Sequence, residues 1–171
     1  MDKLRTVTLR SGDVTGHDQA GAARLGDVNQ TDVTQLPSGF ARFRALLSPT
    51  PRGARLARLL AVEWLRTRPE VPYRVAEAAA QLVAELAANA ATHGRVAGRS
   101  FRLALLAGEG VLRIEVTDTR ADALPHRRPS SLDAESGRGL LLVDALADRW
   151  GTTPGPAPQK TVWAELGLPL P

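Results

Sequence analysis

Cysteine is absent from this 171-residue chain, and histidine and aromatic residues are scarce. Without cysteine the protein cannot hold disulfides, thiolate metal sites or a cysteine nucleophile. Its three histidines, His17, His93 and His126, have no partner at a metal-ligand spacing, so a zinc enzyme is not expected. Aromatic residues make up 4% of the chain, too few to suggest a stacking surface for single-stranded nucleic acid.

Long apolar segments are also missing. No run approaches the ~20 residues of a membrane-spanning helix, and the N-terminus lacks the apolar core of a signal peptide. Together with the lack of cysteine, these absences lead us to expect a cytoplasmic protein that does not enter a membrane. The length suits one domain, and a hydrophobic fraction of 43% is enough to build one buried core.

The positive charge is unevenly distributed. The net charge is +4, and residues 39–74 alone contain eight Arg and two Glu. Twenty of the 22 basic residues are Arg, a bias typical of a GC-rich coding sequence, which weakens any functional interpretation. Arg52, Arg55 and Arg58 stand at helical spacing, and a solvated helix face is the simpler explanation for them. An acidic protein surface is an alternative partner, and DNA is a less favoured one.

The hydrophobic pattern divides the chain into three parts. Residues 1–38 are polar and weakly periodic, so we expect a flexible arm with at most one short strand at 4–9. Residues 39–166 form a single domain, and residues 167–171 a frayed tail. Within the domain we predict strands at 40–47, 100–107, 111–118 and 160–166, and helices at 51–67, 72–93 and 138–149.

The predicted order of elements indicates an α+β fold. We expect a two-layer sandwich in which helices cover one face of a mainly antiparallel or mixed sheet. Residues 119–137 have no period and are long for a loop, which is typical of a functional lid. The expected buried stripes are Leu56, Leu59, Leu60 and Trp64 in the first helix, Val75, Ala79, Leu82, Leu86 and Ala90 in the second, and Leu141, Leu142, Ala145 and Leu146 in the third.

Three polar residues form a row along the second predicted helix. Glu85 and Asn89 lie one turn apart beside the apolar stripe, and His93 continues the row by one more turn. Asparagine disfavours a helix interior by roughly 0.5 kcal/mol relative to alanine, so a specific use is worth considering. Such a row can present a carboxylate and an amide oxygen to a cation or ligand. A satisfied polar border of the helix is the alternative.

Two further features follow this helix along the chain. Asp118 ends a predicted strand directly before the long loop, where it can accept a hydrogen bond from a ligand or simply cap a turn. The third helix begins at Gly137-Arg138-Gly139-Leu140. Glycines at a helix start leave backbone N–H groups uncovered at its positive end, which is suited to phosphate, although this short motif is weak evidence by itself.

In combination and in this order, the motifs resemble the ATP-binding domain shared by gyrase, Hsp90, histidine kinases and MutL. The likeness covers residues 40–166 and is greatest for actinobacterial ATP-binding regulators related to anti-sigma-factor serine/threonine kinases. It implies the Bergerat ATP-binding fold. The residues that carry it are Glu85-Leu-Ala-Ala-Asn89-Ala-Ala-Thr-His93-Gly94, Asp118, Gly137-Arg138-Gly139-Leu140-Leu-Leu-Val143 and Lys160-Thr161-Val162-Trp163.

The resemblance implies ATP and Mg²⁺ as cofactors and gives the motif residues their roles. Asn89 would bind Mg²⁺, and Glu85 would be the general base. Asp118 would accept from the adenine amino group, with help from Thr161. The remaining predicted nucleotide-binding residues are His93, Gly137, Arg138, Gly139 and Leu140.

The resemblance also implies a function in transcription regulation. An anti-sigma kinase of this type phosphorylates a Ser or Thr of an antagonist protein and sequesters a sigma factor, and such kinases often form homodimers. This chain has no glycine in the stretch 119–125, where the family usually has glycines. The alternative is therefore a non-catalytic interaction module that binds its partner without ATP turnover.

Overall fold

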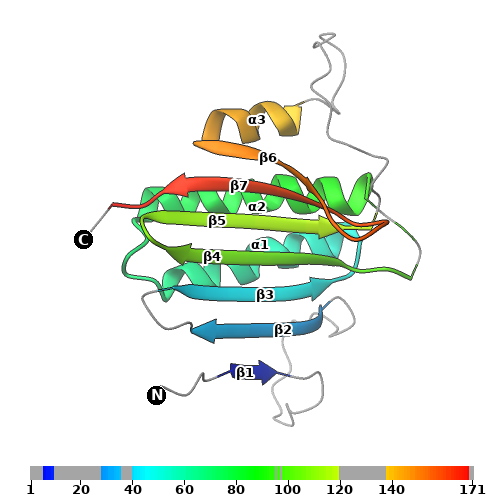
Figure 1. Ribbon diagram of the computed structural model, residues 1–171, viewed down its shortest axis with the longest axis horizontal. Helices are drawn as coiled ribbons and strands as arrows, with labels where there is room; N and C mark the ends of the chain where they lie inside the picture. Colours follow the sequence, from blue (N-terminus) through cyan, green and yellow to red (C-terminus); the bar gives the residue numbers. More distant parts are fainter. Residues whose placement is uncertain are drawn as a thin grey trace.

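The computed structural model describes residues 6–9, 28–35, 40–94, 96, 98–119 and 138–169. It has an α+β fold in which a seven-stranded sheet is covered on one face by helices (Figure 1). The strand order is β1-β2-β3-β4-β5-β7-β6, and all six neighbouring pairs are antiparallel. The strands are β1 Thr6–Leu9, β2 Val28–Gln35, β3 Ala41–Leu47, β4 Phe101–Gly108, β5 Val111–Asp118, β6 Arg149–Pro154 and β7 Lys160–Gly167. The predicted α+β sandwich is thus confirmed.

The two long helices form the second layer, behind the sheet in Figure 1. Helix α1 (Pro51–Arg66) begins at Thr50, whose hydroxyl accepts a hydrogen bond from the Gly53 N–H at 3.0 Å. Proline at the first helical position suits this start because it has no N–H to leave unpaired. Helix α2 (Tyr73–Thr92) follows Pro72 and packs on α1 and on β4, β5 and β7. Both helices agree with the sequence prediction.

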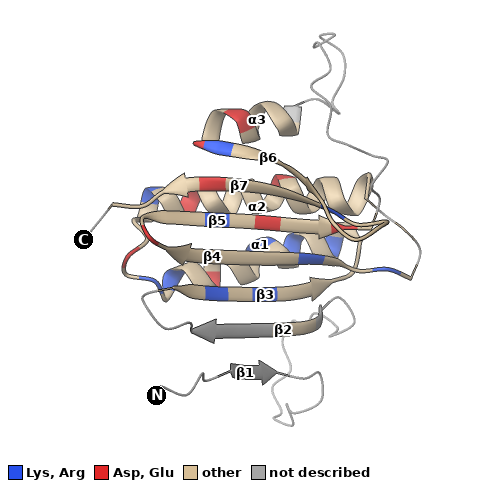
Figure 2. Ribbon diagram, viewed as in Figure 1, with Lys and Arg blue, Asp and Glu red and all other residues tan. Residues whose placement is uncertain are grey.

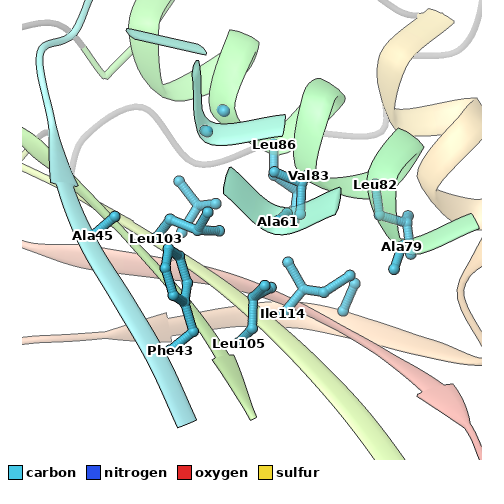
Figure 3. Close-up of a cluster of buried hydrophobic side chains, with 14 of the residues drawn as sticks. Phe43, Ala45, Ala61, Ala79, Leu82, Val83, Leu86, Leu103, Leu105 and Ile114 are labelled. Carbon is cyan, nitrogen blue, oxygen red and sulfur yellow. The ribbon is translucent and has the colours of Figure 1, made fainter. Parts of the chain in front are cut away.

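Strict alternation along the central strands builds the core. In β3, β4, β5 and β7 every second residue faces the helices and is buried. Figure 3 shows these side chains meeting those of α1 and α2, with Phe43, Leu103, Leu105 and Ile114 opposite Ala61, Ala79, Leu82, Val83 and Leu86. The β4–β5 turn is tight because Glu109 and Gly110 both adopt positive φ, as a two-residue hairpin turn requires.

The opposite sheet face carries charged side chains of β5, β6 and β7. Figure 2 marks the charged positions along the strands in blue and red. Arg113 lies at the centre of this face, with its guanidinium 4.4 Å from the ring centroid of Trp163. Arg113 also forms ion pairs with Glu115 at 2.7 Å and Glu165 at 2.6 Å. The same Glu165 pairs with Arg149 of β6 at 2.6 Å. This network ties β5, β7 and β6 together on the face that α1 and α2 leave uncovered.

Two strands differ from the sequence prediction. Residues 28–35, assigned to the flexible arm, form β2, and residues 149–154, assigned partly to the third helix, form β6. Both segments are largely polar in sequence and lack an apolar alternation, and they pair through the backbone with β3 and β7, respectively. Strand β1 falls within the short strand expected at 4–9.

The buried faces of α1 and α3 also differ from prediction. Leu59 is 65% exposed, and α1 instead buries Ala54, Ala57, Ala61 and Leu65 together with Trp64. The prediction selected the largest apolar residues as the buried stripe. It therefore overlooked the alanines, whose small side chains let α1 approach α2 closely. In α3 (Arg138–Leu146), Val143 is fully buried, whereas Leu141 is 61% exposed and Ala145 is exposed.

The ends of α3 and β7 also differ from the sequence prediction. Helix α3 stops at Leu146 because the Asp148 N–H donates to the Glu165 carbonyl, which draws the chain toward β7. Strand β7 continues to Gly167, and the Leu168 N–H donates to the Gly110 carbonyl at 2.7 Å, so residues 167–168 are not frayed. The predicted lid at 119–137 lies outside the described residues from 120 onward.

Candidate functional site

Helix α2 places Glu85 and Asn89 at the border of the core. The helix buries Ala79, Leu82, Leu86 and Ala90, as expected from the apolar stripe, whereas Val75 is half-buried. Glu85 and Asn89 are both half-buried and stand one turn apart next to this stripe. The folded helix therefore presents a carboxylate and a carboxamide side by side at the edge of the helical layer.

The start of α3 packs directly on this pair. A Cβ added to Gly139 would stand 2.7 Å from Glu85 Oε2 and 4.0 Å from Asn89 Nδ2. A side chain at residue 139 would therefore displace the Glu85 carboxylate from its present position. The Glu85 carboxylate therefore lies beside the first turn of α3, the positive end of the helix dipole, where negative charge is favoured.

At the far end of β5, Asp118 is part of a buried ion pair. Lys160 Nζ donates to Asp118 Oδ1 at 2.9 Å, and the two residues face each other across the β5–β7 ladder. Asp118 is 5% exposed and Lys160 is 4% exposed. A Cβ on Gly94, just after α2, would stand 2.6 Å from Asp118 Oδ2. The end of α2 and the end of β5 are thus in direct contact through Asp118.

Thr161 lies on the other face of the sheet from Asp118. Its hydroxyl is 2.8 Å from that of Thr117, and the two threonines are direct neighbours on β5 and β7. Because successive residues of a strand point to opposite faces, Asp118 and Lys160 face the helices while Thr117 and Thr161 face away. The structure therefore brings Asp118 together with Lys160, where the sequence suggested Thr161.

Two other predicted site residues, His93 and Leu140, lie at the end of α2 and in the first turn of α3. His93 follows α2 as its C-cap, is exposed, and donates its backbone N–H to the Asn89 carbonyl at 2.8 Å. Leu140 is half-buried in the first turn of α3. Arg138 begins α3, but its side chain and Gly137 lie outside the part of the chain that the structure describes.

The donor groups at α2 suit Mg²⁺ better than a transition metal. No cluster of three or more His, Asp or Glu able to hold a metal occurs among the described residues. Mg²⁺ is commonly held by one or two protein oxygens, with substrate phosphates and water completing its shell. Asn89 and Glu85 provide one amide oxygen and one carboxylate, so the residues present fit Mg²⁺ bound together with a phosphate ligand.

Two contacts at this site were not anticipated from the sequence. Lys160 and Gly94 both belong to motifs of the sequence resemblance, but the resemblance gave neither residue a role. One signal for Lys160 was available, since it is one of only two lysines in a chain with twenty arginines.

In the described parts of the chain, no helix has both the length and the apolar character needed to cross a membrane.

Comparison with solved structures supports the fold. The chain is similar to the crystal structure of the RsbU and RsbW domains of Rv1364c from Mycobacterium tuberculosis, with a TM-score of 0.58 and 22% sequence identity. The likeness covers 79% of this chain but only 33% of that one. No curated protein matches the sequence of this chain.

A family model gives the stronger result. The model of the histidine kinase-like ATPase domain matches residues 47–164, more than half of the chain. The matched segment includes all four motifs that carried the sequence resemblance, from Glu85 to Trp163, and it confirms that resemblance. The chain therefore belongs to the histidine kinase-like ATPase family.

Proposed function

We propose that this protein binds ATP with Mg²⁺ and transfers the terminal phosphate to a Ser or Thr of a partner protein. Family membership supports nucleotide binding. The packing of Gly139 against Glu85 and Asn89 supports the location, because it joins the two most specific motifs at one place. This contact is the observation on which the proposal chiefly rests.

Each residue of the site receives a chemical role. The Glu85 carboxylate accepts the proton of the attacking hydroxyl as the hydroxyl oxygen bonds to the γ-phosphorus. The bond from this phosphorus to the bridging oxygen then breaks, and ADP leaves. Asn89 would hold Mg²⁺ through its amide oxygen, and the bound ion would neutralise charge on the phosphate oxygens. Backbone N–H groups at the start of α3 bind phosphate in the position that favours anions.

The same proposal assigns a regulatory role. The similar crystal structure contains an RsbW domain, which supports the anti-sigma type of kinase that the sequence motifs resemble. We infer that the acceptor is an anti-sigma antagonist and that the unphosphorylated complex determines whether a sigma factor is sequestered. A homodimer would fit this role, and a cytoplasmic location follows from it.

The test uses the protein as bait in an extract of its own cells, with Mg-ATP labelled at the γ-phosphate. We expect a small captured protein to gain label on Ser or Thr. The Glu85→Gln variant should capture the same protein without labelling it. Equal labelling by Glu85→Gln would remove Glu85 as the base, and the absence of label with every captured protein would contradict the kinase proposal.

One observation favours a second candidate, a non-catalytic interaction module. The Asp118 carboxylate, expected to bind adenine, already forms a buried ion pair with Lys160. If this pair excludes the base, the fold would serve only to bind a partner. Capture of the partner would then be the same with and without Mg-ATP, whereas the kinase proposal predicts that nucleotide changes it.

A further inference from the structure

Lys160 and Asp118 form the only ion pair among the described residues in which both side chains are almost fully buried. They occupy the inward rows of β7 and β5, whose other members are all apolar and buried: Leu112, Ile114, Val116, Val162, Ala164 and Leu166. Lys160 Nζ and Asp118 Oδ1 are 2.9 Å apart. Two opposite charges thus end an otherwise apolar face of the sheet.

Packing alone does not account for this pair. Removing two charges from water costs free energy that their mutual attraction often fails to recover, and an apolar pair of similar volume is commonly as stable or more so. The chain also contains twenty arginines and two lysines, yet the buried cation is a lysine. A lysine provides a compact point charge, whereas the planar guanidinium of arginine needs more room.

The surroundings fix the direction of the Asp118 carboxylate. Lys160 binds Oδ1, and the backbone at Gly94 lies so close to Oδ2 and Cβ that a methyl group there would approach them to 2.6 and 2.8 Å. The carboxylate is therefore held between β7 and the end of α2. An acceptor with a fixed direction discriminates between ligands better than one that can rotate.

We propose that Lys160 is a positioning residue that holds Asp118 in the orientation that accepts the adenine amino group. This inference rests on the proposed function, because it concerns base recognition at the same nucleotide site. Lys160 thereby sets the preference for ATP over purine riboside triphosphate, which lacks the amino group. Loss of Lys160 removes the hydrogen bond that orients Oδ1 of Asp118, and the preference for the amino group falls.

The experiment measures the ratio of the two dissociation constants by calorimetry in the presence of Mg²⁺. For the wild type we expect ATP to bind about tenfold more tightly, as suits one hydrogen bond to a charged acceptor. Lys160→Met should reduce this ratio to about one, and Lys160→Arg should restore part of it. A merely structural role would change the melting temperature but leave the ratio unchanged.

A double variant tests the inference in a protein that keeps its fold even if Lys160→Met alone does not. Asp118→Val combined with Lys160→Met replaces the ion pair by an apolar pair, which should fold and should also show a ratio near one. A ratio near tenfold in either Lys160→Met or the double variant overturns the inference. A wild-type ratio near one overturns the inference but not the proposed function, whereas a wild type that binds neither nucleotide overturns both.

Discussion

The backbone of Gly139 lies against the carboxylate of Glu85, so closely that a Cβ on residue 139 would come within 2.7 Å of Glu85 Oε2. Two motifs that are far apart in the sequence therefore meet at the start of α3. Because Asn89 stands one turn further along α2, the same glycine lies beside the carboxylate and the amide at once. The proposed site depends on this arrangement.

Replacing Gly139 by alanine tests whether the close approach matters for function. The new methyl group must displace the end of the Glu85 side chain, which is flexible, while alanine favours a helix by about 0.5–1 kcal/mol over glycine. We expect the free energy of unfolding to be unchanged or higher, and phosphate transfer to fall at least about tenfold. Urea unfolding and the transfer rate provide the two measurements.

Gly167→Ala is the matched control for this substitution. A Cβ at Gly167 would meet only Asp148 Oδ2, at 3.5 Å, which is an ordinary contact. We expect neither stability nor transfer to change. Full transfer activity in Gly139→Ala would show that the Glu85 carboxylate does not need its present position.

The Glu165 ion pairs predict a pH-dependent contribution to stability. Burial alone would raise the pKa of Glu165, but hydrogen bonding and charge from Arg113 and Arg149 outweigh burial and lower it. A lowered pKa in the folded state stabilises the protein above the unfolded value, near 4.5, and this stabilisation is lost as the pH falls through the folded value. Glu165→Gln should therefore cost about 1 kcal/mol at pH 7, since its partners are partly exposed, and much less in acid.

Urea unfolding at neutral and acidic pH measures this difference. Glu63→Gln is the control, because the Glu63–Arg66 pair is 3.6 Å long with both side chains about three-quarters exposed. We expect no measurable effect from it at either pH. An equal loss for Glu165→Gln at both pH values would show that the ion pairs do not stabilise the fold.

Two leucines of α1 test which face of the helix is buried. Leu65 is 2% exposed and belongs to the core, whereas Leu59 is 65% exposed. Leu65→Ala should reduce the free energy of unfolding by about 2–5 kcal/mol, and Leu59→Ala by less than about 0.5 kcal/mol. A similar loss for both variants in urea unfolding would contradict the orientation of α1.

The sequence was sufficient for the elements with strong periodicity. The alternation of Val111–Asp118 and the apolar stripe of α2 predicted a strand and a helix that the structure contains. Strands β2 and β6 could not be found this way, because their residues are largely polar and show no apolar alternation. Their position depends on backbone hydrogen bonding to a strand edge.

The candidate site, too, was predictable only where its residues follow a local sequence pattern. Helical spacing placed Glu85 and Asn89 together, but the glycine motif predicted only uncovered N–H groups for phosphate, not the packing of Gly139 on these two residues. The Asp118–Lys160 pair depends on the register of β5 against β7, and a shift of one residue would place Thr161 opposite Asp118 instead. Single-sequence patterns do not fix that register.

Calorimetric titration with Mg-ATP tests the central claim most directly, that α2 and the start of α3 form a nucleotide site. We predict that the wild type binds ATP more tightly with Mg²⁺ than with EDTA, and that Asn89→Ala loses this dependence on Mg²⁺. Absence of both heat and a rise in melting temperature for the wild type at millimolar Mg-ATP would contradict the claim.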